Sequence, residues 1–202
     1  LIRELKAGLL TDSTLNLRGT FASEGGRPQY NADLEFATGE FDKLMAWAGV
    51  KLNPTAPATY QKAAGKAKFV GDFHYLQLAP YELTLDKSVF KGEAGFVLTT
   101  PLKSFVMVNI DSINLDNYLP PLASNEAKAP FVSRLLSRLQ NNEALSKIDM
   151  RVMLKADLAI VENLPMENLD MVLKLNNGAL RLERFEVKNA ANAKVSMTGS
   201  LS

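Results

Sequence analysis

The sequence predicts a mainly β protein: a long, curved, largely antiparallel sheet of repeated modules that forms an elongated groove, with two short amphipathic helices. Three observations lead to this prediction. Apolar and polar residues alternate through most of the 202 residues, one stretch of alternation is unusually long, and a weak internal repeat is present. Alternation with period two is typical of strands that bury one face, because successive side chains point to opposite sides of a sheet.

The longest alternating stretch covers residues 148–161. Its apolar positions are Ile148, Met150, Val152, Leu154, Ala156, Leu158 and Ile160. At roughly 3.3 Å per residue this stretch extends about 46 Å, well beyond the usual strand of about 5–6 residues. We therefore expect one continuous strand here. Shorter runs of the same kind cover residues 15–21, 30–36, 81–85 and 169–175, and Asn177-Gly178 after the last run is typical of a tight hairpin turn.

Three segments depart from simple alternation. Residues 105–108 are apolar at every position, which favours a central strand. Residues 41–48 have helical spacing and stop at Gly49. Residues 131–140 follow Pro130 and place their apolar residues on one helical face. This second helix has two interpretations: it caps one end of the sheet, or it contacts a membrane surface.

A weak repeat aligns two parts of the chain. Asp116 lies 74 residues after Asp42, and the same offset aligns Ala32, Leu34 and Phe36 with Val106, Val108 and Ile110. Repeats of this kind bury their apolar faces by stacking on their neighbours. With the breaker-rich loops 53–59 and 120–130, the repeat indicates one elongated segment, 1–202, with approximate modules 11–60, 61–145 and 146–202.

Composition restricts the possible functions. The net charge is +1, which gives no overall field to attract nucleic acid, and the chain contains no Cys. No apolar run approaches the roughly 20 residues that span a bilayer. The chain lacks an initiator Met and stops within a strand-like segment. We therefore expect a piece of a longer protein, with any anchor or export signal outside it.

Residues that could carry chemistry are few. His74 is the only histidine, and Asp72 is its neighbour on the same strand face, but no third ligand accompanies them. A structural or surface histidine is therefore the preferred interpretation. The lysines at 62, 66 and 68 have no interleaved aromatic residues, which argues against nucleic-acid binding. We expect no catalytic residue, no metal, no cofactor and no enzymatic activity.

Three stretches carry a resemblance to a known family: 81–94, 104–120, and 173–182 leading to 195–201. In this order they resemble the AsmA family of Gram-negative envelope proteins, which includes the TamB-like bridge proteins, and together they cover about half of the chain. The resemblance implies an inner-membrane anchor outside this chain and a periplasmic body with an open, apolar β-groove. It also implies a role in outer-membrane homeostasis and phospholipid movement between membranes, without catalytic residues.

The apolar strand face is the remaining functional signal. Two short helices cannot cover this much sheet, so either the sheet folds on itself or part of the face stays open to an apolar ligand. We expect the open face to bind phospholipid, and the candidate lining residues are Leu83, Leu85, Val106, Val108, Leu154, Leu173 and Leu175. Phe105 and Met107 are an equally apolar alternative to the two valines. The alternative function is a non-catalytic scaffold that contacts outer-membrane assembly proteins through a sheet edge.

Overall fold

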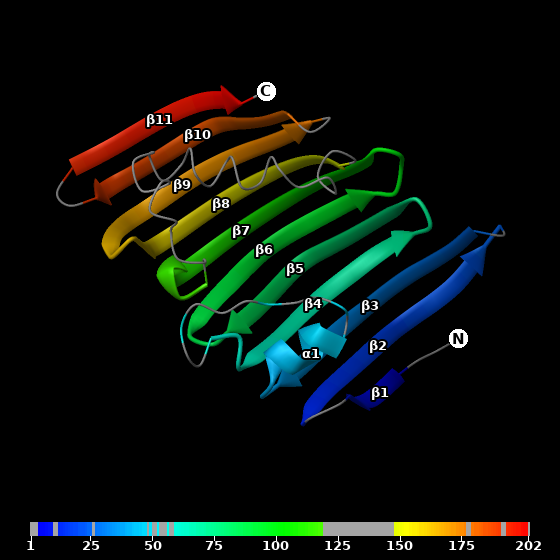
Figure 1. Cartoon of the computed structure of the whole chain (residues 1–202). Coiled ribbons are helices and arrows are strands. Elements are labelled where there is room, and N and C mark those ends of the chain that lie inside the picture. The colour runs from blue at the N-terminus through cyan, green and yellow to red at the C-terminus, as the bar shows by residue number, and fades with distance from the viewer. Residues whose placement is uncertain are drawn as a thin grey trace.

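The described residues form a single 11-stranded sheet in which every strand lies beside its neighbours in sequence (Figure 1). This computed structural model describes residues 4–9, 12–25, 27–47, 49, 52, 56, 59–118, 148–176, 179–190 and 193–201. The prediction of a mainly β, largely antiparallel sheet is confirmed. The strands are β1 (Glu4–Leu9), β2 (Ser13–Glu24), β3 (Arg27–Thr38), β4 (Ala63–Asp72), β5 (Tyr75–Leu85), β6 (Ser88–Val97), β7 (Leu102–Asn114), β8 (Ile148–Val161), β9 (Leu164–Asn176), β10 (Ala179–Ala190) and β11 (Ala193–Leu201).

The longest alternating stretch is one continuous strand, β8, as predicted. However, its strict alternation ends after Ala156. Ala159 and Val161 belong to the buried cluster beyond that point, whereas Leu158 and Ile160 do not. The prediction that all seven apolar residues share one buried face is therefore wrong for the last two.

The strands beside β8 show the same change in which residues along the strand are buried. Ala159 pairs with Ile113 of β7 and Met166 of β9, and Met166 pairs with Ala190 of β10. Asn168 of β9 has a φ of 53°, in the left-handed region that short polar side chains tolerate. One residue in this conformation interrupts the regular alternation of side chains. Met166 and Leu169, three residues apart, are consequently both buried in the same cluster.

Strand β7 lies between β6 and β8, which confirms the central position predicted from its doubly apolar sequence. Its pairing with β8 is parallel, with Leu102 opposite Ile148, and all other pairs in the described sheet are antiparallel. A parallel pair requires a crossover connection, because both strands begin at the same end of the sheet.

The aligned repeats have similar local structures. Strands β2 and β3 are followed by helix α1 (Phe41–Trp47), which contains Asp42, and strands β6 and β7 are followed by the short 3-10 helix η1 (Leu115–Asn117), which contains Asp116. The two units then diverge. Strand β3 pairs antiparallel with β4, whereas β7 pairs parallel with β8.

Helix α1 confirms the first predicted helix, and Gly49 after it has the positive φ of 82° that suits a helix stop. The second predicted helix, 131–140, lies outside the described residues. Within the described part of the chain, no helix has both the length and the apolar character needed to cross a bilayer.

Candidate functional site

The candidate site is a single face of the sheet, which we call the apolar face. The strand register places all seven predicted lining residues on it. Val106 is opposite Val152, which is opposite Leu173, and Val108 is opposite Leu154. Leu175, Leu83 and Leu85 occupy the same face through their pairs with Met150, Phe90 and Ser88. Phe105 and Met107 lie on the opposite face.

Burial divides these seven residues into two groups. Leu173 and Leu175 are buried, at 8% and 3% exposure, whereas Leu83, Leu85, Val106, Val108 and Leu154 are half-buried. The buried pair belongs to β9, and the half-buried residues belong to β5, β7 and β8. The strand register therefore places all seven residues on one face of the sheet, but the residues differ in their exposure to solvent.

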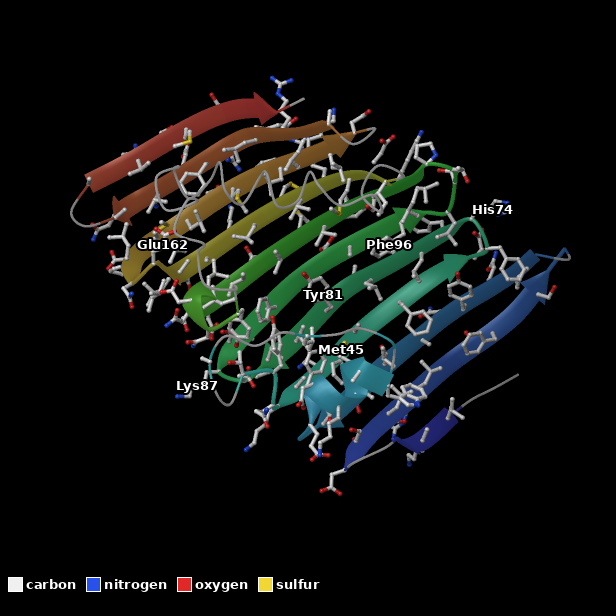
Figure 2. All side chains as sticks on the ribbon, in the orientation of Figure 1. Met45, His74, Tyr81, Lys87, Phe96 and Glu162 are labelled. Atoms are coloured by element: carbon white, nitrogen blue, oxygen red, sulfur yellow. The ribbon has the colours of Figure 1, made fainter. Side chains whose placement is uncertain are left out.

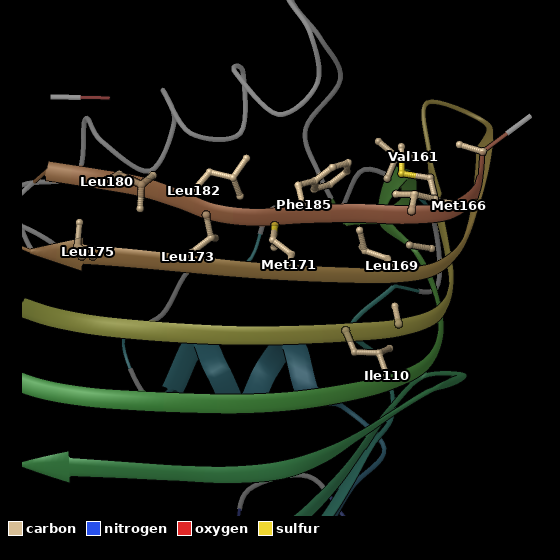
Figure 3. Close-up of a cluster of buried hydrophobic side chains, with 14 residues drawn as sticks. Ile110, Val161, Met166, Leu169, Met171, Leu173, Leu175, Leu180, Leu182 and Phe185 are labelled. Atoms are coloured by element: carbon tan, nitrogen blue, oxygen red, sulfur yellow. The ribbon is translucent and has the colours of Figure 1, made fainter. Parts of the chain in front are cut away.

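The buried part of the apolar face is centred on β9 and β10. Figure 3 shows Leu173, Leu182 and Phe185 projecting to the same side of these strands. Leu182 and Val187 are each only 1% exposed. The register between β9 and β10 shifts between Leu182 and Arg184, so Leu182 and Phe185 point the same way although they are three residues apart. This part of the face is a packed core.

The other part of the face, on β2 to β6, is half-buried and rich in aromatic rings. Phe21, Tyr30 and Phe69 form a row across three strands, with ring centroids 6.3 and 6.0 Å apart. The Phe36 ring covers Gly65 of β4, where an added Cβ would lie 2.5 Å from the ring. Aromatic side chains that cover glycines in this way compensate for the missing side chains of the neighbouring strand.

Small polar residues and backbone contacts of α1 lie at one end of this half-buried part. The Ser13 hydroxyl donates a 2.7 Å hydrogen bond to the Thr38 hydroxyl, and both residues are buried. Backbone N–H groups of Phe41 and Asp42 donate to the carbonyls of Gln61 and Tyr60, which attaches α1 to the segment before β4. These hydrogen bonds join β2, β3, α1 and the segment before β4 at this end of the sheet.

A cluster around Asp86 adjoins the same end. The carboxylate of Asp86 accepts hydrogen bonds from the backbone N–H groups of Tyr60, Gln61 and Lys62 and from the Tyr118 hydroxyl at 3.1 Å. The Tyr60 and Tyr118 rings meet edge to face at 5.1 Å. Partial burial, and then the nearby Asp86 carboxylate, raise the pKa of Tyr118 to about 12. With four donors, Asp86 serves to join the loop before β4 to the end of β7.

The opposite face of the sheet, the polar face, carries a hollow of about 950 Å³. Residues from nine strands, β2 to β10, line it, and no local sequence pattern predicted it. One cross-strand row on this face is rich in charged residues, and we call this the charge row: Glu35, Lys66, Glu82, Lys91, Asn109, Lys155, Asp170 and Glu186. Arg184, opposite Val172, contacts Asp170 from the adjacent position. The row lies across the strands, so it becomes visible only once the register is known.

His74 lies at the turn between β4 and β5, not within a strand as the sequence suggested. Its side chain is 82% exposed, and Figure 2 places it at the opposite end of the sheet from Lys87 and Glu162. The Asp72 carboxylate accepts hydrogen bonds from the backbone N–H groups of His74 and Tyr75, which explains the turn. The described residues contain no group of three or more His, Cys, Asp or Glu side chains arranged to hold a metal ion.

Comparisons with known protein families, with curated proteins and with solved structures found no match to this chain.

Proposed function

We propose that this chain is the periplasmic segment of an AsmA-like protein and that it binds phospholipid acyl chains along its apolar face. In this proposal the sheet is curved into an elongated groove, and an anchor outside this chain tethers it to the inner membrane. The bound lipid moves between the inner and outer membranes and so supports outer-membrane homeostasis. One observation supports the proposal: a continuous apolar face extends across the sheet, and its large side chains on β2 to β6 are only half-buried.

The size of the half-buried region supports an acyl chain as ligand. At about 4.8 Å per strand, the distance from β2 to β6 is about 19 Å. This exceeds the roughly 15 Å occupied by the acyl chains of one leaflet, which is half of a hydrocarbon core about 30 Å thick. Each buried CH₂ contributes about 0.8 kcal/mol, and binding of this kind requires only a dry apolar surface.

Photo-crosslinking in cells tests the proposal. A photoreactive residue at Leu83 or Leu154, on the apolar face, is expected to attach phospholipid after expression in a bacterial envelope. The matched control is Lys155, the immediate neighbour of Leu154, whose side chain is exposed on the polar face. Crosslinks at Lys155 without crosslinks at Leu83 or Leu154 would show that our proposal assigns the lipid to the wrong face of the sheet.

The second candidate function is a scaffold. Among the described strands, β1 and β11 each pair with a single neighbour, so each leaves one backbone edge open. An open edge can accept a strand from another protein. Native mass spectrometry of the gently purified chain separates the candidates: co-purified phospholipid supports the groove, and a stable protein partner without lipid supports the scaffold.

A further inference from the structure

Exposed apolar side chains gather at one end of the sheet. The described residues include eight large apolar side chains that are exposed, and half of them lie at or beside the β4–β5 turn and the end of β6. We call these four residues the turn patch: Val70, Phe73, Val97 and Leu98. Phe73 is the most exposed, at 70%, and the other four of the eight are spread singly over β1, α1, β9 and β11.

Strand pairing makes the residues of the turn patch neighbours. Tyr75 pairs with Val97 at the end of the β5–β6 ladder. One residue further, the Leu98 N–H donates a 2.7 Å hydrogen bond to the His74 carbonyl. This bond holds Leu98 beside the turn that contains Phe73. The patch is therefore built by two adjacent turns that are fixed to each other.

The turn patch adjoins the aromatic part of the apolar face. Tyr30, Gly71, Leu76 and Phe96 form one cross-strand row on this face. The row lies next to the patch in sequence, because Gly71 is two residues before Phe73 and Phe96 is two residues before Leu98. Figure 2 shows Phe96 towards the same end of the sheet as His74. The half-buried apolar surface thus extends to the turn patch.

The two turns of the patch lack charged side chains. Residues 73–81 and 94–102 contain no Asp, Glu, Lys or Arg. Turns at the opposite end of the sheet do contain them: Asp86 and Lys87 lie between β5 and β6, and Glu162 lies between β8 and β9. Because a charged side chain is costly to place in hydrocarbon, the end with the turn patch enters lipid more readily than the opposite end.

Backbone groups of these turns are hydrogen-bonded within the protein. The Asp72 carboxylate accepts from the backbone N–H groups of His74 and Tyr75, at 2.6 and 3.0 Å. The Thr99 N–H donates to the Val97 carbonyl at 2.8 Å. Backbone groups without partners are strongly unfavourable in hydrocarbon, so these hydrogen bonds lower the cost of moving the turns out of water.

The size of the turn patch favours a lipid surface over a protein partner. A whole aromatic side chain has about 150–250 Å² of surface, so four side chains that are 40–70% exposed present roughly 400 Å². A standard protein–protein interface buries about 800 Å² on each partner. Insertion into a bilayer interface requires only a few apolar side chains. We propose that the turn patch inserts into the surface of a membrane, with Phe73 and Leu98 contacting the acyl layer.

This inference deepens the proposed function and rests on it for its consequence, which is that lipid enters the apolar face from the membrane beside the turn patch. The membrane contact itself does not require lipid to bind along the apolar face. The two ideas are therefore measured separately.

Vesicle flotation tests the membrane contact, with vesicles of phosphatidylethanolamine and phosphatidylglycerol as the probe. The wild-type chain is expected to float with the vesicles at low and at high salt, because an apolar contact is not screened. Combined Phe73→Ser and Leu98→Ser substitutions are expected to weaken binding at least about tenfold. The matched control is Leu164→Ser, at an exposed leucine of the β8–β9 turn, which should bind like the wild type. Absence of wild-type flotation, or an equal loss in the control, would overturn the proposal.

Tryptophan fluorescence identifies the end that enters the membrane. Trp47 is the only tryptophan of the chain, so Phe73→Trp or Leu164→Trp in a Trp47→Phe background gives a single reporter. Vesicles with brominated acyl chains should quench the Phe73→Trp reporter and leave the Leu164→Trp reporter unquenched. The reverse pattern, or no quenching of either reporter, would contradict insertion of the turn patch.

A third reporter, Leu83→Trp on the apolar face, separates this inference from the proposed function. Quenching of Phe73→Trp without Leu83→Trp supports the membrane contact and contradicts acyl binding along the face. Quenching of Leu83→Trp without Phe73→Trp supports acyl binding and overturns the membrane contact.

Discussion

The two ends of the apolar face have the same sequence pattern and different burial. On β10, Leu182 and Val187 are each 1% exposed, whereas Leu17 of β2 and Leu34 of β3 are only half-buried. All four residues lie on strands with apolar–polar alternation. The comparison shows that alternation determines which face of a strand is apolar but carries no information about whether that face is covered.

The two ends also differ in how they fill the face. Strand β4 contributes Gly65, Ala67 and Gly71, and rings from β3 extend over the glycines. Strands β9 and β10 instead present large aliphatic residues at nearly every inward position, such as Leu173 and Leu182. The aromatic rings occupy the space that side chains at the glycine positions would fill, which helps to fix the register of these strands.

The largest expected effect is a difference between matched leucine truncations. Leu182→Ala should lower the free energy of unfolding by about 2–5 kcal/mol, because it leaves a cavity in a packed core. Leu17→Ala should cost about 1 kcal/mol, since the side chain is half-buried and loses only part of its transfer free energy. Urea denaturation of both variants measures the difference, and equal losses would contradict the division of the face.

A second prediction concerns the sequence-predicted helix at 131–140. If its apolar residues pack on the sheet, Leu135→Asp should destabilise the fold by a few kcal/mol, because it buries an unpaired charge. Thermal melting measures the loss, and Arg134→Asp on the opposite helical face is the control. An unchanged melting temperature combined with loss of liposome binding would favour the membrane-surface interpretation.

A smaller effect is expected at the Asp86 cluster, which adjoins one end of the half-buried region. Tyr118→Phe removes the hydroxyl that donates to Asp86 and should cost about 1 kcal/mol. Because the pKa of Tyr118 is raised to about 12, the folded chain retains a proton that the unfolded chain loses near pH 10. This contribution is therefore fully present below about pH 10 and is lost as the pH rises towards 12.

Alkaline titration of tyrosinate absorbance measures this shift. Burial also raises the pKa of Tyr60 and Tyr81, so the wild type should show three tyrosines that ionise late on exposure to base, with Tyr118 last. Tyr118→Phe should lose the last of these steps, and an unchanged last step in the variant would contradict its assignment to Tyr118.

The sequence was sufficient for the elements with strong local signals. The alternation predicted β8 with its observed bounds, and helical spacing with a terminal glycine predicted α1. The same alternation assigned Leu83 and Leu173, far apart in sequence, to a common side of the sheet.

Features that depend on pairing between strands were missed. The change of phase after Ala156 is associated with one left-handed residue, Asn168, on the neighbouring strand. The charge row consists of single residues on separate strands, such as Glu82 and Lys91, that only the register brings together. The parallel pairing of β7 and β8 is likewise not indicated by the sequence of either strand. If the predicted strands had been aligned as hairpins, residues 66, 82 and 91 would have been placed opposite one another. This was the one sequence signal that could have indicated the charge row.

Cysteine labelling tests the division of the apolar face most directly, because the natural sequence contains no Cys. Single substitutions Leu17→Cys, Leu34→Cys and Leu83→Cys probe the half-buried end, and Leu173→Cys, Leu182→Cys and Val187→Cys probe the buried end. Reaction rates with a maleimide are measured in the folded and the urea-unfolded protein. We predict that the first three react in the folded state within about tenfold of their unfolded rates, that added phospholipid slows them, and that the last three are protected by several orders of magnitude. Similar protection at both ends, or rates at the first three that phospholipid leaves unchanged, would contradict an open apolar surface that binds lipid.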